Sequence, residues 1–247
     1  MFLILIKLIS KQNAHKFYVM TIRDPFSRTV SAFRYGHPKN IVARAKMGEK
    51  VYNKPGPKEI ALYEQCFLSL DDFAMLLNSS TIPNKVFGRL INAGDAINMT
   101  CKKVAQAIMN HQTNGISQHL HFDLHHFYNQ IPAKQNATLF AIRTENLRQD
   151  FIKINQILGQ APGTIAINEN IARDSTNIAM PISAEIGDLG RSHLCSSPFL
   201  QREYKTYFRI LHQAVNIHTD DMREMHEAAR KNCPSLDSAK LLQIISG

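Results

Sequence analysis

The chain has 247 residues, of which 44% are hydrophobic and 20% are charged. These values are ordinary for a soluble protein, and the chain is long enough for one sizeable α/β domain. The formal net charge of +9 favours an anionic partner: a nucleotide, a sulfated or carboxylated glycan, a nucleic acid or a membrane surface. Because the basic residues are spread along the chain without a nucleic-acid-binding motif, we do not expect direct nucleic-acid binding.

The first ten residues, MFLILIKLIS, are mostly apolar and are interrupted by Lys7. This run is too short to span a membrane, and no small-residue cleavage site of the signal-peptide kind follows it. We therefore expect no membrane span within this chain. The spacing of Phe2, Leu5, Ile6 and Ile9 predicts the buried stripe of a helix that leads into the next element.

Residues 16–35 have the pattern of a strand followed directly by a helix. The run from Phe17 to Ile22 is apolar and β-prone, with little alternation, as in a strand buried on both faces of a parallel sheet. Asp24 fits the N-cap because its carboxylate can accept a free backbone N–H, and Pro25 fits the first helical position because it lacks one. The sequence therefore predicts a strand, a tight turn and a helix.

This turn carries side chains that bind anions. Arg23 lies where the strand ends, and Ser27, Arg28 and Ser31 follow in the helix, with the two serines on one face. Guanidinium groups, hydroxyls and a helix N-terminus together favour a phosphate or sulfate group. The alternative is that Arg23 and Asp24 only cap the helix and that Ser31 faces solvent.

The middle of the chain is predicted to be mostly helical. Residues 36–58 are the exception, because they are basic and rich in Gly and Pro; they predict a loop or lid that could grip an acceptor, or a solvated connection. Ser69 and Asp72 resemble a capping box that opens a short helix through Leu77, and residues 95–110 suit another helix.

Cysteines and glycosylation sequons bear on the compartment. The cysteines are widely spaced without a C-x-x-C pair, so we expect no zinc site, and two disulfides are possible whose pairing the spacing does not reveal. Three sequons, at Asn78, Asn98 and Asn136, favour a secretory lumen. The four cysteines are Cys66, Cys101, Cys195 and Cys233.

Five histidines occur within residues 111–128. His121 and His125 have the i, i+4 spacing that permits a metal pair, but neither an H-E-x-x-H motif nor a third ligand accompanies them. We therefore predict a surface helix here and no metal site.

Two later segments carry amphipathic helices. Residues 137–159 predict a strand and then a helix that ends at Gly159. Residues 182–217 predict a long helix in their second half. In both helices, apolar residues recur at spacings of three and four, so each helix must pack against another element. They are Leu147, Phe151, Ile154 and Leu158 in the first, and Leu200, Tyr204, Tyr207, Leu211 and Val215 in the second.

Taken in order, these segments resemble a known family. The string R-D-P-x-x-R-x-x-S-A-F, from Arg23 to Phe33, resembles the 3′-phosphate-binding segment of the sulfotransferases that use 3′-phosphoadenosine 5′-phosphosulfate (PAPS). The resemblance is to the Golgi carbohydrate sulfotransferase-like group and its bacterial and algal relatives. An R-T-E-x-L-x-x-D pattern over residues 143–150 and the region 182–217 are similar to later segments of that family, so the resemblance covers most of the chain. In the family, a Gly-Arg-rich loop precedes the long helix of the second segment, and the resemblance implies the same here.

The resemblance implies a P-loop NTPase-like sulfotransferase fold, a short parallel sheet flanked by helices, in a single domain over residues 1–247. It implies transfer of a sulfuryl group from PAPS, as co-substrate, to a hydroxyl of a carbohydrate, with anionic glycans among the possible acceptors. By the resemblance, Arg23 and Ser31 hold the 3′-phosphate, Arg28 is a third contact, and no metal is required. The expected compartment is the Golgi lumen or the membrane-associated secretory pathway, with the cytoplasm as the alternative.

Sulfuryl transfer also needs a base for the acceptor proton and positive charge at the leaving phosphate. The candidates for the base are His37, just beyond the motif, and His119, whose Q-H-L string resembles a G-H-L segment of algal and cyanobacterial members. No G-x-x-x-x-G-K-[ST] string or Lys-Thr-Gly-type loop precedes the strand at residue 16.

We therefore expect an N-terminally incomplete sulfotransferase or a non-catalytic nucleotide- or polyanion-binding member of the same fold. A P-loop kinase relative would need a Walker-type lysine and Mg²⁺ ligands, which we do not find in the sequence.

Overall fold

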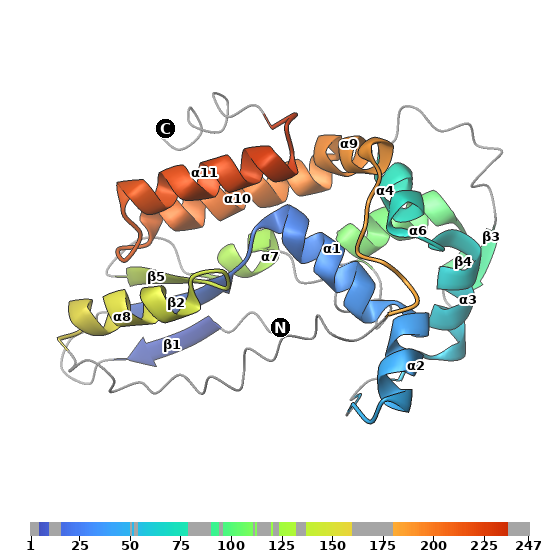
Figure 1. Ribbon diagram of the computed structural model, residues 1–247, viewed down its shortest axis with the longest axis horizontal. Helices are drawn as coiled ribbons and strands as arrows, with labels where there is room; N and C mark the ends of the chain where they lie inside the picture. The colour runs from blue at the N-terminus through green and yellow to red at the C-terminus, as the bar shows by residue number, and fades with distance from the viewer. Residues whose placement is uncertain are drawn as a thin grey trace.

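The computed structural model describes residues 5–9, 16–49, 51, 54–78, 90–93, 96–110, 112, 120, 124–131, 137–159 and 180–236. This part of the chain is a mixed α/β structure, mostly helical, with a short three-stranded sheet and a separate two-stranded sheet (Figure 1). The strands are β1 (Leu5–Ile9), β2 (Lys16–Ile22), β3 (Leu90–Ala93), β4 (Ala96–Thr100) and β5 (Ala137–Arg143). The helices are α1 (Pro25–Gly36), α2 (Pro38–Lys46), α3 (Pro57–Cys66), α4 (Leu70–Leu77), α6 (Cys101–Met109), α7 (Leu124–Tyr128), α8 (Leu147–Ile157), α9 (Asp188–Ser196), α10 (Pro198–Gln213) and α11 (Thr219–Asn232).

The larger sheet has the strand order β1-β2-β5. The pair β2 and β5 is parallel, from Lys16 opposite Ala137 to Ile22 opposite Arg143. Strand β1 runs antiparallel to β2, so the sheet is mixed and the helix predicted over the first ten residues is wrong. An isolated short helix is marginal, whereas pairing with β2 satisfies the backbone groups of this segment.

Both faces of the parallel pair are covered, as the sequence predicted for β2. Alternate side chains of β2 and β5 belong to the main core, to which α1 and α10 also contribute. The intervening side chains pack in a smaller cluster with Ile154, Leu147 and Phe151 of α8. The predicted α8 stripe fails only at Leu158, which is 37% exposed because it follows the last helical residue. The chain turns at Gly159, which has a φ of 67°.

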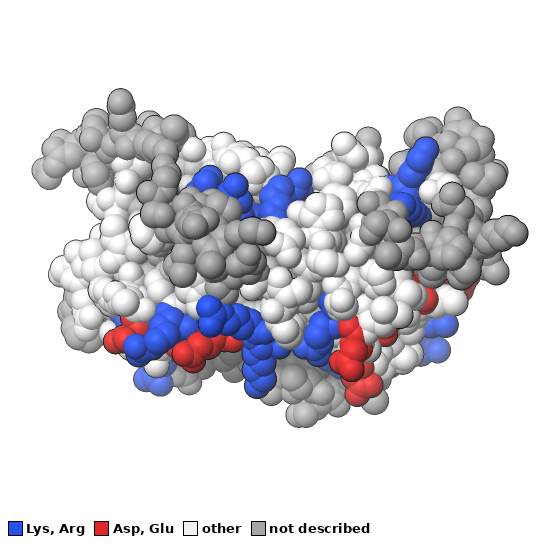
Figure 2. Space-filling view, turned by 90° about the horizontal axis from the view of Figure 1, so that it is seen from above, with Lys and Arg blue, Asp and Glu red and all other residues white. Residues whose placement is uncertain are grey.

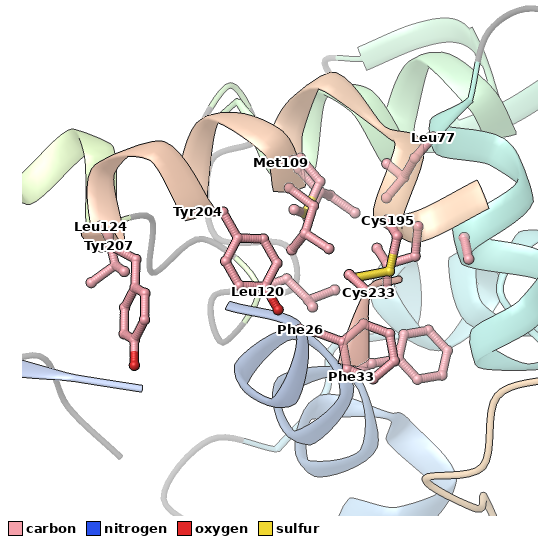
Figure 3. Packing of buried hydrophobic residues seen from close by; sticks show 14 of the residues in the cluster. Phe26, Phe33, Leu77, Met109, Leu120, Leu124, Cys195, Tyr204, Tyr207 and Cys233 are labelled. Atoms are coloured by element: carbon pink, nitrogen blue, oxygen red, sulfur yellow. A yellow bond between two sulfur atoms is a disulfide. The ribbon is translucent and has the colours of Figure 1, made fainter. Parts of the chain in front are cut away.

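The long helix α10 forms the centre of the main core. Its predicted stripe Leu200, Tyr204, Tyr207 and Leu211 is at most 1% exposed, and Figure 3 shows both tyrosines on its inner side. Val215 lies beyond the end of the helix and is 47% exposed, so the stripe was extended one turn too far. The Gly-Arg-rich segment before α10 is also helical: Gly190, Arg191 and Ser192 lie within α9.

The loop predicted over residues 36–58 is largely wrong. Helix α2 occupies Pro38–Lys46, and α3 begins at Pro57. Each proline stands at the first position of its helix, where a backbone N–H would have no helical partner and its absence has no cost. The Gly and Pro content of this segment therefore did not indicate a loop. The helix beginning after Ser69 is confirmed, with the predicted capping box to Asp72. The helix predicted over residues 95–110 is only partly right, because strand β4 occupies Ala96–Thr100 and helix α6 begins at Cys101.

Two disulfides connect distant elements. Cys66–Cys101 joins the end of α3 to the start of α6, and Cys195–Cys233 joins α9 to the residue after α11, beside Phe26 and Phe33 in Figure 3. Disulfides are typical of oxidising compartments and are compatible with a secretory lumen. Over the described residues, no helix is both long and apolar enough to cross a membrane.

The three sequons have different settings. Asn78 is half-buried, and its side-chain amide donates to Ser196 Oγ at 3.0 Å. Asn98 lies in β4, and Asn136 is outside the described residues. Glycosylation at these positions stays a prediction from the sequence.

Candidate functional site at the strand ends

Arg23 leaves the carboxyl end of β2 beside the loop that follows β5. The two strands stay paired one residue further, because Thr144 N–H donates to Ile22 C=O at 2.9 Å. Arg23 Nε lies 3.8 Å from Glu145 Oε1, and the two side chains are 37% and 38% exposed. Ligands of open α/β sheets bind outside the carboxyl ends of parallel strands, which is where these two side chains meet.

Asp24 caps α1 and is also a buried junction between three helices. Its carboxylate accepts the backbone N–H of Ser27 at 2.8 Å, the hydroxyl of Tyr204 at 2.9 Å and the side-chain amide of Asn232 at 2.9 Å. It is 7% exposed. Because this carboxylate already occupies the N-terminus of α1, an anion bound here has to be held by side chains and not by the helix end.

The beginning of α1 is also held by residues from the far end of the chain. Ser27 Oγ accepts a hydrogen bond from Asn232 Nδ2 at 3.3 Å. The guanidinium of Arg191 donates to Asn232 C=O at 3.4 Å and lies 5.2 Å above the ring of Phe26. These contacts join α9 and α11 to the turn, and nothing in the local sequence pattern indicated them.

The other two predicted phosphate contacts differ in their surroundings. Ser31 lies one turn beyond Ser27 along α1 and is half-buried. Arg28 lies 3.8 Å from Glu203 Oε2, with 14% and 4% of the two side chains exposed. Glu203 also accepts the backbone N–H of Leu124 at 2.7 Å, so Arg28 balances a buried carboxylate that holds α7. The contacts of Arg28 thus favour a structural role.

His37, one candidate for the base, has a structural environment. It caps α2, where its Nδ1 accepts Lys39 N–H at 3.2 Å, and its Nε2 lies 3.3 Å from Phe67 C=O. The ring is 2% exposed and packs edge-on against Tyr63. Both ring nitrogens are therefore engaged away from the strand ends. His119, the other candidate, lies outside the described residues.

The burial of His37 predicts a pH dependence of stability. Desolvation, opposed by the Phe67 hydrogen bond and aided by Lys39, lowers the pKa of His37 from 6.5 to about 4. Between these values the unfolded chain binds a proton that the folded protein does not. The free energy of unfolding is therefore highest above pH 6.5, as far as His37 determines it, and falls as the pH drops towards 4. His37→Asn keeps an acceptor for the α2 cap without this titration. We expect urea unfolding to show the variant losing about 3 kcal/mol less than the wild type between pH 7 and pH 4, and equal losses would contradict this role.

The R-T-E-x-L-x-x-D pattern forms a buried ion-pair network. Arg143 and Asp150 are both 0% exposed and are joined through two guanidinium nitrogens at 2.9 and 2.6 Å. Arg143 also reaches Asp221 of α11 at 2.8 Å, and Lys153 donates to the same carboxylate at 2.7 Å. Burial opposes ionisation of Asp221, but the hydrogen bonds from Lys153, His218 N–H and Arg143 prevail and lower its pKa to about 2. The pattern thus joins β5, α8 and α11.

No group of three His, Cys, Asp or Glu side chains in the described residues has a metal-binding arrangement. Of the two histidines with i, i+4 spacing, His121 lies outside those residues, and the side chain of His125 contacts Thr206 and Asn129. Neither a protein-family model nor a curated protein nor a solved structure is found to match this chain.

Proposed function

We propose that this protein is a PAPS-dependent sulfotransferase of the carbohydrate type, with a P-loop NTPase-like fold and a place in the secretory pathway. In this reaction the acceptor oxygen forms a bond to sulfur, and the bond between sulfur and the 5′-phosphate oxygen breaks. The nucleotide leaves as 3′-phosphoadenosine 5′-phosphate, and the acceptor proton passes to a base. The described residues bear on one part of this function, recognition of the nucleotide's 3′-phosphate.

The observation that carries the proposal is the setting of Arg23. The side chains of its neighbours Asp24 and Arg143 are buried and hydrogen-bonded within the protein, whereas that of Arg23 is 37% exposed at the strand ends. Its 3.8 Å separation from Glu145 is longer than a charge-assisted hydrogen bond, which is about 2.7–2.9 Å. A 3′-phosphate would accept two hydrogen bonds from this guanidinium, and Ser31 supplies a hydroxyl on the helix that follows.

Nucleotide binding is tested by thermal unfolding. At about 100 times its dissociation constant, 3′-phosphoadenosine 5′-phosphate is expected to stabilise the native state by about 2.7 kcal/mol, or roughly 5–10 °C for a chain of this size. Arg23→Ala should remove most of this shift while costing little stability itself, because its ion pair is exposed. The control is Arg223→Ala, which also breaks an exposed arginine–carboxylate pair, with Asp220, and should keep the shift.

The outcomes separate the two parts of this claim. Equal shifts in the wild type and Arg23→Ala would remove Arg23 from the site. Absence of a shift in all three proteins would remove the nucleotide site itself.

A non-catalytic nucleotide-binding protein is the second candidate. It is favoured by the structural engagement of both ring nitrogens of His37, one of the two candidates for the base. Incubation with sulfur-labelled PAPS and carbohydrate acceptors distinguishes the two. Labelled product from the wild type and not from Arg23→Ala supports the transferase, and binding without product supports the second candidate.

A further inference from the structure

Helices α6, α7 and α10 carry basic side chains with almost no acidic ones. Their sequences hold five Lys and Arg residues, and Glu203 is the only acidic residue. Glu203 is 3% exposed and faces inward to Arg28 and α7. Figure 2 shows Lys and Arg groups without acidic neighbours on one side of the molecule, and a band of mixed charge along the opposite edge.

The basic side chains of α10 form a ridge, which consists of Arg202, Lys205, Arg209 and His212. Their spacings of three, four and three place them on one face of the helix, opposite the buried tyrosines. The ridge is about 15 Å long, from the helical rise per residue. Lys205, Arg209 and His212 are exposed. Arg202 is half-buried and donates to Met109 C=O at 3.5 Å, which ties the ridge to the end of α6.

Folding alone does not account for the ridge. Like charges four residues apart, such as Lys205 and Arg209, destabilise a helix by a few tenths of a kcal/mol when no acidic side chain lies between them. Helix α11 has the usual compensation, since Arg223 there pairs with Asp220 at 2.9 Å. A row of cations along a helix is suited to a linear ligand that carries repeated negative groups.

We propose that the α10 ridge binds a sulfated or carboxylated polysaccharide chain lying along the helix. This proposal rests on the proposed function for the existence of a carbohydrate acceptor. It adds that the acceptor is negatively charged. Two features favour a polysaccharide over a nucleic acid. The aromatic residues Tyr204, Tyr207 and Phe208 are buried and offer no surface on which bases could stack. The two disulfides suit a secretory lumen and are rare in proteins of the cytosol and nucleus, the compartments that hold nucleic acids.

The test is heparin binding by the full chain, measured by calorimetry at several salt concentrations. Lys205→Gln with Arg209→Gln should weaken binding at least about tenfold and reduce the slope of log affinity against log salt by about two, one for each lost ionic contact. The control is Arg230→Gln with Lys231→Gln, which removes the same charge from exposed positions on α11 and should leave affinity nearly unchanged. Unchanged circular dichroism establishes that both variants fold.

Three results would overturn the proposal: no heparin binding by the wild type, an equal loss in the control, or equally tight binding of duplex DNA of similar length. An equal loss would mean that net charge alone drives binding. Because heparin binding is measured without nucleotide, these results are independent of the Arg23 test. The ridge variant should also keep the thermal shift with 3′-phosphoadenosine 5′-phosphate.

Discussion

Asp150→Ala is expected to lower the free energy of unfolding by about 3–5 kcal/mol, because it leaves the buried guanidinium of Arg143 without its main partner. Asp150 accepts two hydrogen bonds from that side chain and a third from the Arg143 backbone N–H at 2.7 Å. Asp221 would remain as the other carboxylate, at 2.8 Å. A loss of this size is a large part of the stability of a typical domain.

Urea unfolding followed by circular dichroism measures this effect. The matched control is Asp220→Ala, which removes a carboxylate from an arginine pair whose side chains are 86% and 71% exposed, and it should change stability by no more than about 0.5 kcal/mol. If Asp150→Ala does not fold, Asp150→Asn keeps part of the hydrogen bonding and should unfold at lower urea than the wild type. Similar stability of Asp150→Ala and Asp220→Ala would contradict the role of the buried pair.

Asp24→Ala should be the second most damaging of these changes, with a loss of about 3 kcal/mol. Loss of the α1 cap costs about 1 kcal/mol, and the buried Tyr204 hydroxyl left without its acceptor costs roughly 1–3 kcal/mol more. Tyr204 is 0% exposed, and burial, followed by its contact with Asp24, raises its pKa above the usual value.

A double-mutant cycle separates the two costs. Tyr204→Phe alone should cost about 1 kcal/mol, and adding it to Asp24→Ala should cost less than the sum of the single changes, because the orphaned hydroxyl is then absent. Strict additivity in equilibrium unfolding would show that the 2.9 Å contact between these side chains does not contribute in the way described here.

Local patterns in the sequence were sufficient for the elements around the turn. The strand before Arg23, the Asp24 cap and the Pro25 start were all predictable, because each depends on neighbouring residues. The apolar stripes of α8 and α10 were also predictable over most of their length. Where each stripe was extended past its helix end, to Leu158 and Val215, periodicity gave no signal for the end.

Contacts between distant segments could not be predicted. Asn232 and Tyr204 reach Asp24 across 208 and 180 residues, and no periodicity links such positions. The pairing of the four cysteines could not be predicted for the same reason. Asp24, which was expected only to cap a helix, therefore also joins α1, α10 and α11. Its carboxylate occupies the N-terminus of α1, which the sequence predicted as part of an anion site.

Composition was a weaker guide than position. The Gly- and Pro-rich segment 36–58 was predicted as a loop, but Pro38 and Pro57 start helices there. The apolar segment Leu5–Ile9 was predicted as a helix and is an edge strand, because its partner β2 offers hydrogen bonds that a short isolated helix lacks.

The central claim is that Arg23 recognises a nucleotide's 3′-phosphate, and calorimetric titration of the wild type and Arg23→Ala with two nucleotides tests it most directly. The wild type should bind 3′-phosphoadenosine 5′-phosphate at least about tenfold more tightly than adenosine 5′-phosphate, since a charge-assisted hydrogen bond contributes about 1.5–3 kcal/mol. Arg23→Ala should bind the two nucleotides about equally. Equal affinity of the wild type for both nucleotides would contradict the claim.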